Sequence, residues 1–215
     1  MKLQKLGGYV AIAWVCWVPA TTIIVQLILS HLGLSLSDME SADPSKLITA
    51  YGISPTTFIV TQSIIMLEGI FALLIILALH ERMAHKAPYL MHLALIAVSI
   101  FAALHFIGGI SYISSSAGIA ESKDISTYRA IAAMRSGFSA AGYHIWGWAL
   151  LLSGWAALKT RSLPRISTYL ILLYGIFAIL GYIAEQISLL RFVLFIPSMI
   201  WLGIVLIRKE KSSQS

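Results

Sequence analysis

Long uncharged apolar runs are the feature that most limits what this chain can fold into. No Asp, Glu, Lys or Arg occurs in residues 6–37, 87–120, 136–158 or 166–184. Each run approaches or exceeds the roughly 20 residues that an α-helix needs to cross the hydrocarbon core of a bilayer. Charged residues make up 11% of the chain, whereas soluble domains carry about 25%. We therefore expect an all-α, polytopic integral membrane protein.

Helix-start signals divide the chain into about six transmembrane helices. Proline stands at or near the first helical position at Pro55, Pro88 and Pro164, where its missing N–H breaks no hydrogen bond. The predicted helices cover residues 8–32, 55–79, 88–114, 129–158, 164–187 and 190–207. Because the predicted cytoplasmic loops are short, consecutive helices are expected to pack as antiparallel neighbours in one bundle.

The longest predicted loop, 33–53, lies on the external side. Ser45 is a typical N-cap residue and Gly52 a typical helix stop, so we expect a short helix between them. Such a helix would cap the external mouth of the bundle. No loop has room for a catalytic domain, and residues 1–215 are interpreted as a single transmembrane domain.

The distribution of Lys and Arg predicts the orientation. If the N-terminus is inside, the cytoplasmic segments hold ten of the 15 cationic side chains, namely Lys2, Lys5, Arg82, Lys86, Lys159, Arg161, Arg165, Arg208, Lys209 and Lys211. Cytoplasmic loops generally carry this excess, so we expect an N-in, C-in protein of a prokaryotic plasma membrane. The net charge of +6 follows from this topology. We expect a lipid bilayer as the partner, and no nucleic acid.

Five ionisable residues lie away from the cytoplasmic ends at mid-helix positions of the predicted helices, namely Glu68, His105, Arg135, His144 and Glu185. An ionisable side chain inside a bilayer is costly, so by default it marks a function or meets a partner inside the bundle. Counting helical rises places Glu68, His105 and His144 at similar depth, about 16–24 Å from the cytoplasmic ends. Arg135 and Glu185, the latter in the fifth predicted helix, lie nearer the external interface.

Stripes of small residues predict which helix faces pack inward. One stripe comprises Ala133, Gly137, Ala140, Ala141, His144 and Trp148. A second comprises Ala102, His105, Gly108, Gly109 and Tyr112, and Thr61, Glu68 and Ala72 share a third face. These patterns predict that His144, His105 and Glu68 all point into the bundle.

We interpret Glu68, His105 and His144 as a polar centre that binds or moves a small or lipidic molecule, with Arg135 and Glu185 nearer the outside. A buried carboxyl group beside histidines can exchange a proton near neutral pH, which suits proton coupling. In the alternative, a structural or immunity-type membrane protein, the same residues only join helices, with hydrogen bonds worth roughly 1 kcal/mol each.

A second hypothesis makes His105 and His144 the axial ligands of one b-type haem in an electron carrier or sensor. They have matching depth on adjacent antiparallel helices, and glycines nearby make room for a porphyrin. Otherwise no cofactor and no metal site is expected. Six helices are few for a carrier alone, so transport favours a homodimer, for which Ala133, Gly137 and Ala141 offer a contact.

An enzymatic function is less expected than ligand binding or transport. A serine nucleophile needs its base within hydrogen-bond reach. Ser139 and His144 are five residues apart on one helix and point about 140° apart, which leaves only His105 as a base from a neighbouring helix. A metal hydrolase needs three histidines or a buried aspartate, and only two histidines lie at mid-membrane.

Residues 142–208 resemble the bacterial membrane family known as domain of unknown function 4386. The resemblance is carried by Gly142-Tyr-His-Ile-Trp-Gly-Trp148, Ser153, Arg161-Ser-Leu-Pro-Arg165, Gly175 and Gly181-Tyr182. The family usually has a glycine shortly after the Pro-Arg pair, where this chain reads Ile166-Ser-Thr-Tyr169. His144 is the position that matches the family's Gly-x-His run. Because the family has no established activity, the resemblance implies the helical membrane fold and leaves the function open.

Overall fold

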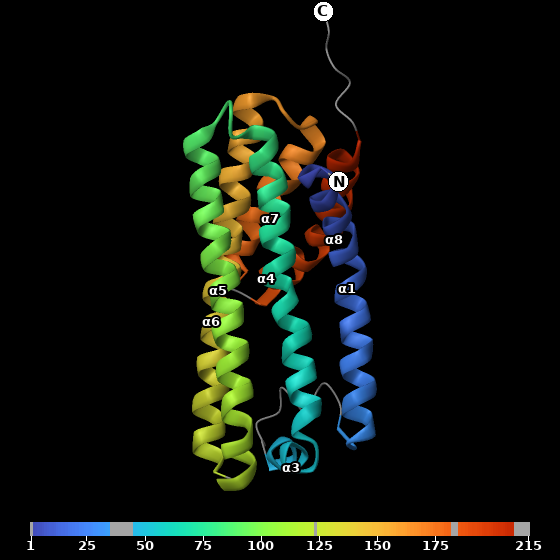
Figure 1. Ribbon diagram of the computed structural model, residues 1–215, viewed down its shortest axis with the longest axis vertical. Helices are drawn as coiled ribbons and strands as arrows, with labels where there is room; N and C mark the ends of the chain where they lie inside the picture. The colour runs from blue at the N-terminus through green and yellow to red at the C-terminus, as the bar shows by residue number, and fades with distance from the viewer. Residues whose placement is uncertain (1, 35–44, 123, 182–184, 209–215) are drawn as a thin grey trace, which may run out of the picture.

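The computed structural model describes residues 2–34, 45–122, 124–181 and 185–208. All regular structure within these ranges is helical, as the apolar runs predict. The helices are α1 (Leu3–His31), α3 (Ser45–Ile53), α4 (Pro55–Met83), α5 (Pro88–Ser122), α6 (Ile125–Thr160), α7 (Arg165–Leu180) and α8 (Glu185–Ile207). The longer helices lie side by side in a bundle, and α3 lies across one end of it (Figure 1).

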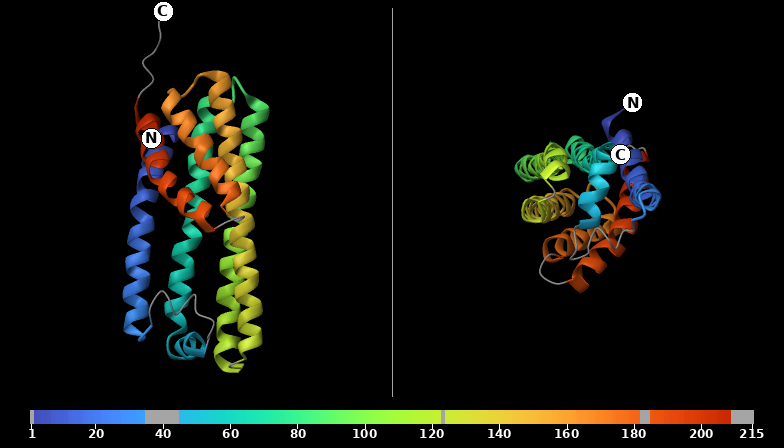
Figure 2. Two further views of the ribbon diagram at one scale, coloured as in Figure 1. Left: turned by 180° about the vertical axis from the view of Figure 1, so that it is seen from behind. Right: turned by 90° about the horizontal axis from the view of Figure 1, so that it is seen from below.

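The long helices form a ring in which each packs on its neighbour in the chain and α8 returns to α1 (Figure 2). The start of α1 and the end of α8 lie at the same end of the bundle as the α4–α5 and α6–α7 turns. At this end the Arg82 guanidinium group donates hydrogen bonds to the carbonyl oxygens of Ser162, at 3.0 Å, and Val205, at 3.4 Å. One side chain thereby joins α4, the α6–α7 turn and α8.

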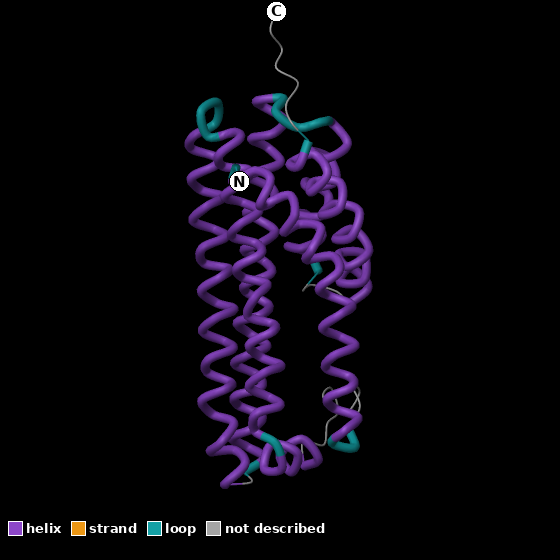
Figure 3. Tube along the Cα trace, turned by 45° about the vertical axis from the view of Figure 1, so that its right-hand side comes forward, coloured by secondary structure: helices purple, strands orange, loops and turns teal. Residues whose placement is uncertain are grey.

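Helix α7 does not run the length of the bundle. It has 16 residues against 36 in α6, so at about 1.5 Å per residue it is less than half as long. Near its end, the carbonyl oxygen of Ile179 lies 3.3 Å from Nδ1 of His144, close to the midpoint of α6. Helix α7 therefore ends, and α8 begins, part-way along the bundle (Figure 3). Beyond that level the ring consists of α1, α4, α5 and α6.

Among the described residues, four helical segments are long and apolar enough to cross a membrane, namely Leu3–His31, Ile59–Met83, Pro88–Ser115 and Leu190–Ile207. Arg165–Leu180 is a shorter apolar helix. Helix α6 is long but more polar, since it carries Arg129, Arg135 and Lys159. The chain is thus a helical membrane protein.

The helix starts predicted from proline are confirmed. Pro55 begins α4, Pro88 begins α5, and Pro164 directly precedes α7. The short helix predicted from Ser45 is also confirmed as α3, which packs against α4, α5 and α6 at the end of the bundle. The rest of the predicted external loop, residues 35–44, lies outside the described residues.

Several predicted helix boundaries are wrong. Helix α1 begins at Leu3 instead of 8, and α4 ends at Met83 instead of 79. Helix α5 continues to Ser122 instead of 114, and the Ser114 and Ser115 hydroxyls, which donate to the Ser111 carbonyl oxygen, leave the helix unbroken. Helix α7 ends at Leu180 instead of 187, with Gly181 as the C-cap. Helix α8 begins at Glu185 instead of 190, so Glu185 belongs to this helix and not to the preceding one.

Helix α6 begins at Ile125, one turn before the predicted start, because Asp124 caps it. The Asp124 carboxylate accepts hydrogen bonds from the backbone N–H groups of Ser126 and Thr127 and from both hydroxyls. These hydrogen bonds, first those of Thr127 and then those of Ser126, lower the pKa of Asp124 from 3.8 to about 2. The cap is therefore a carboxylate at neutral pH.

The Asp124 cap predicts a pH dependence. A carboxyl group whose pKa is lowered by folding stabilises the folded state above its unfolded pKa, and this stabilisation is lost as the pH falls through the folded pKa. Between about pH 4 and pH 2, the thermal midpoint of the detergent-solubilised protein should fall more than that of Asp124→Asn. Asn also caps helices but does not titrate in this range. Parallel curves for the two proteins would contradict the assignment.

The core of the bundle is aromatic at the level where α7 and α8 begin to complete the ring. Trp14 is 2% exposed. Its ring centroid lies 5.6 Å from that of Trp146, 5.4 Å from Phe195 and 6.2 Å from Phe71. Trp14 therefore joins α1 to α4, α6 and α8 through one side chain.

Two pairs of glycines bring helix backbones into close contact. A Cβ atom on Gly147 of α6 would lie 2.7 Å from the carbonyl oxygen of Gly175 on α7. A Cβ on Gly8 of α1 would lie 2.8 Å from the carbonyl oxygen of Gly203 on α8. Small residues at such crossings are the usual basis of helix packing in membranes. These contacts hold the α7–α8 pair against the long helices.

Candidate functional site

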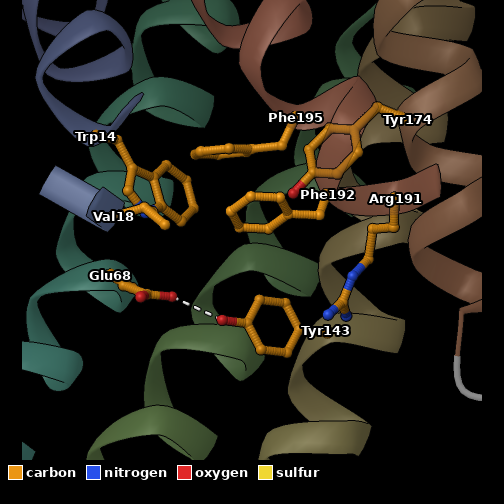
Figure 4. Close-up of a pocket in the computed structure, with 8 residues that line it drawn as sticks. All are labelled: Trp14, Val18, Glu68, Tyr143, Tyr174, Arg191, Phe192 and Phe195. Carbon is orange, nitrogen blue, oxygen red and sulfur yellow. Dashed lines mark hydrogen bonds between the residues drawn. The ribbon is translucent and has the colours of Figure 1, made fainter. Parts of the chain in front are cut away.

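Glu68 and Tyr143 form the central polar contact of the bundle. Glu68 lies midway along α4 and is half-buried, and Tyr143 comes from the middle of α6. The Tyr143 hydroxyl donates a hydrogen bond of 2.7 Å to Oε2 of Glu68 (Figure 4). Among the residues that the structure describes, the only carboxylate in the middle of α4 therefore has a specific partner on α6.

Arg191 of α8 completes this group from the other side of Tyr143. Its guanidinium carbon lies 4.6 Å from the centroid of the Tyr143 ring. An arginine over an aromatic face is attracted by the negative charge density of the ring. Tyr143 thus contacts an acid through its hydroxyl and a base through its face, and we refer to Glu68, Tyr143 and Arg191 as the central triad.

A cavity of about 90 Å³ adjoins the central triad (Figure 4). It is lined by Trp14, Val18, Glu68, Tyr143, Tyr174, Arg191, Phe192 and Phe195. The space is large enough for water molecules or for one small polar group. Charged groups on one side and aromatic walls on the other are the usual composition of a ligand site.

A second cavity of about 50 Å³ lies between α4, α5 and α6 and shares Tyr143 with the first. Its polar lining consists of Gln62, His105, Arg135, Ser139 and Tyr143. The two cavities therefore both adjoin Tyr143. Polar groups continue from the central triad towards the half of the bundle that α7 and α8 do not reach.

His105 lies beside the central triad, on the inward face that its small-residue stripe predicts. It is 8% exposed, and its ring packs at 4.1 Å on Phe101 and edge-on at 5.3 Å against Tyr143. Its Nδ1 lies 3.2 Å from the Phe101 carbonyl oxygen. A Cβ on Gly142 would lie 3.2 Å from the His105 ring, so this glycine lets α5 and α6 approach there.

His144 points outward, and the prediction of an inward face is wrong. Its side chain is exposed, as are Ala133, Gly137, Ala141 and Trp148 on the same stripe. Successive helical residues are separated by about 100°, so Tyr143 and His144 cannot both face the centre. The inward face of α6 is instead formed by Gly142, Trp146, Gly147 and Leu150, which are buried.

Both ring nitrogens of His144 have partners. Nδ1 lies within hydrogen-bond distance of the Ile179 carbonyl oxygen, and Nε2 accepts a hydrogen bond of 3.3 Å from the Trp148 indole. His105 and His144 thus face different neighbours. The haem hypothesis stays a prediction. In the described part of the chain, no three His, Cys, Asp or Glu side chains group together as metal ligands.

Arg135 lines the second cavity, where its guanidinium carbon lies 4.8 Å over the Tyr112 ring. Its predicted neighbour Glu185 begins α8, and the side chain of Glu185 lies outside the described residues. Ser139 lines the same cavity as His105. No hydrogen bond joins Ser139 to either histidine within the described part of the structure, so the geometry offers no activated serine.

Two members of the central triad were missed by reasoning from the sequence. Tyr143 directly precedes His144 in the Gly-Tyr-His motif, but tyrosine is not costly in a membrane helix and so gives no signal. A last helix that starts at residue 190 puts Arg191 at the external rim, where an arginine is not costly either. Because α7 ends at Leu180 and α8 begins at Glu185, Arg191 lies well inside α8, at the level of Glu68. The sequence would have to show this early helix end for Arg191 to be recognised.

Comparison of the chain with protein-family models, curated proteins and solved structures finds no match. The resemblance to domain of unknown function 4386 stays a prediction. The functional argument therefore rests on the geometry of the central triad and its two cavities.

Proposed function

We propose that the protein binds or moves a small or lipidic molecule at the central triad, with exchange of a proton at Glu68. The observation that carries this proposal is the contact of a carboxylate and a guanidinium group with one tyrosine, beside a cavity with aromatic walls. Charged groups within a membrane are costly, so a protein that retains them around a cavity gains a function from them. Packing alone would favour a filled, apolar core at this position.

The ends of α7 and α8 support the position of the site. Transporters commonly place substrate at mid-membrane beside helices that end within the bilayer. Helix α7 ends part-way along the bundle, and the cavity lies near the beginning of α8, which supplies Arg191 and Phe192. In our proposal a ligand reaches Glu68 from the half of the bundle that contains only α1, α4, α5 and α6.

In the same proposal six helices lie in a prokaryotic plasma membrane, with both ends of the chain in the cytoplasm. Helices α6 and α7 join the four long apolar segments as membrane helices, and α7 and α8 end part-way through the bilayer. This arrangement agrees with α1 starting and α8 ending at the same end of the bundle. Lys5, Arg82 and Arg165 belong to this end, which supports its assignment to the cytoplasm.

Infrared difference spectroscopy between acid and alkaline pH tests the proton site, with the protein in lipid nanodiscs. The wild type should show, among the C=O stretches of its protonated carboxylic acids, a component from a carboxyl group shielded from water, and Glu68→Gln should lose this component. Tyr143→Phe should shift this band, because it removes the hydroxyl that donates to Glu68. The control Glu81→Gln, at an exposed position in the same helix, should leave the band unchanged.

Native mass spectrometry of the same samples tests for a bound molecule. An additional small or lipidic mass is expected on the wild type and on Glu81→Gln, but not on Glu68→Gln. A band that survives in Glu68→Gln, together with identical masses for all variants, would contradict the proposal. The homodimer stays a prediction, and the exposed face of Ala133, Gly137 and Ala141 is available for that contact.

A further inference from the structure

A buried amide group in the second cavity has no partner. Gln62 of α4 is 2% exposed, and its Nε2 makes no hydrogen bond within the described residues. Gln62 lines the cavity of about 50 Å³ between α4, α5 and α6. An unsatisfied buried donor costs free energy that a hydrogen-bond acceptor in the cavity would recover. The cavity is large enough for such a group, since one water molecule takes up about 30 Å³.

A cation lines the same cavity. Arg135 of α6 lies over the Tyr112 ring and has no acidic partner among the described residues. The Ser139 hydroxyl, one turn along α6, adds a third donor to the lining. Gln62, Arg135 and Ser139 together present N–H and O–H groups from two helices, and the only formal charge among them is positive. This combination selects a hydrogen-bond acceptor with a negative charge.

The size and charge of the cavity select the anion. One arginine balances one negative charge, which favours a monoanion. A carboxylate is small and planar, and it matches the fork of a guanidinium group. A phosphodiester has the same charge but is bulkier and carries two substituents. Arg135 and Ser139 also line an adjoining hollow of about 250 Å³ with Ala132 and Ser136, where the remainder of a ligand can lie.

We propose that Gln62, Arg135 and Ser139 bind the carboxylate group of the ligand. This inference rests on the proposed function and adds its chemical class, because the second cavity adjoins the central triad through Tyr143. The carboxylate belongs either to a fatty acid from the bilayer or to a small carboxylate from water. The negatively charged group is held on one side of Tyr143, and Glu68 lies on the other.

Equilibrium binding to the purified protein in neutral detergent tests this site with three probes: oleate, acetate and the uncharged oleyl alcohol. The variants are Arg135→Gln, which removes the charge, and Gln62→Leu, which removes the amide. Arg165→Gln is the matched control, because it removes an exposed arginine at the start of α7. Thermal unfolding of each variant verifies that the protein remains folded.

We expect a carboxylate probe to bind, and Arg135→Gln to weaken its affinity by about tenfold or more, as for the loss of a charged hydrogen bond. Gln62→Leu should weaken it by about fivefold, as for a neutral hydrogen bond, and Arg165→Gln should leave it unchanged. Oleate binding without acetate binding identifies a membrane source. Binding of acetate with the same dependence on the variants identifies a soluble one.

The proposal is overturned if no carboxylate binds, if Arg135→Gln and Gln62→Leu leave the affinity unchanged, or if Arg165→Gln weakens it equally. It is also overturned if oleyl alcohol binds as tightly as oleate. After any of these results, an infrared band that still depends on Glu68 would leave the proposed function standing, and only the carboxylate assignment would fail. Loss of both the band and the binding would remove the proposed function as well.

Discussion

Replacing Trp14 with alanine is expected to lower the free energy of unfolding by about 3 kcal/mol, near the low end of the range for Trp→Ala in protein cores. Trp14 is almost fully buried and contacts aromatic rings of α4, α6 and α8. The low end of this range applies because lipid tails are as apolar as the protein core. Removing the indole ring therefore costs mainly its packing contacts. Reversible unfolding in mixed micelles measures the change.

Trp155→Ala is the matched control for Trp14→Ala. Trp155 lies on α6 with 61% of its surface exposed, and its removal should change the stability by less than about 0.5 kcal/mol. Trp14→Phe should recover part of the lost stability, since it restores an aromatic ring among Phe71, Trp146 and Phe195. Equal losses for Trp14→Ala and Trp155→Ala would mean that Trp14 does not hold the helices together.

Gly147→Ala is expected to cost about 1–3 kcal/mol, as overpacked positions do. The added methyl group would lie 2.7 Å from the carbonyl oxygen of Gly175, and a backbone atom cannot turn aside as a side chain can. Helix α7 would have to move away from α6. The carbonyl of Ile179 would then lose its contact with His144, and the α7–α8 pair that supplies Tyr174 and Arg191 would be displaced.

Gly137→Ala in the same helix separates packing from helix propensity. A Cβ on Gly137 meets nothing within 4 Å. Alanine is the better helix former by about 1 kcal/mol, so this variant should be as stable as the wild type or more so. Thermal unfolding of the two variants in the same detergent compares them directly. If Gly147→Ala also gains stability, α7 is not seated on α6 as described.

The helical membrane fold and several helix ends could be predicted, because they depend on local chemistry. Uncharged runs, Pro55, Pro88 and the Ser45 start all act within a few residues of chain. The inward face of α5 was also predictable, since His105, Gly108 and Gly109 lie on one stripe and are all buried.

The face of α6 and the length of α7 could not be predicted, because both depend on contacts between helices. Alanine and glycine suit a lipid-facing surface as well as a close crossing, so Gly137 and Gly147 look alike in the sequence. Residues 166–184 are uncharged throughout, which predicts solubility in lipid but not where α7 stops. The central triad follows from these two properties. Tyr143 faces inward only because His144 faces out, and Arg191 reaches the Tyr143 ring only because α8 begins early.

The short α7 has a consequence for the membrane around the protein. At the level of Arg82 the ring contains all of the long helices, whereas beyond Ile179 it contains only α1, α4, α5 and α6. The bundle is therefore tapered along its long axis, and a bilayer that surrounds both parts is displaced by unequal cross-sectional areas in its two leaflets. A tapered inclusion has a lower energy where the membrane curves to match it, so this chain is expected to concentrate in bilayers of one sign of curvature.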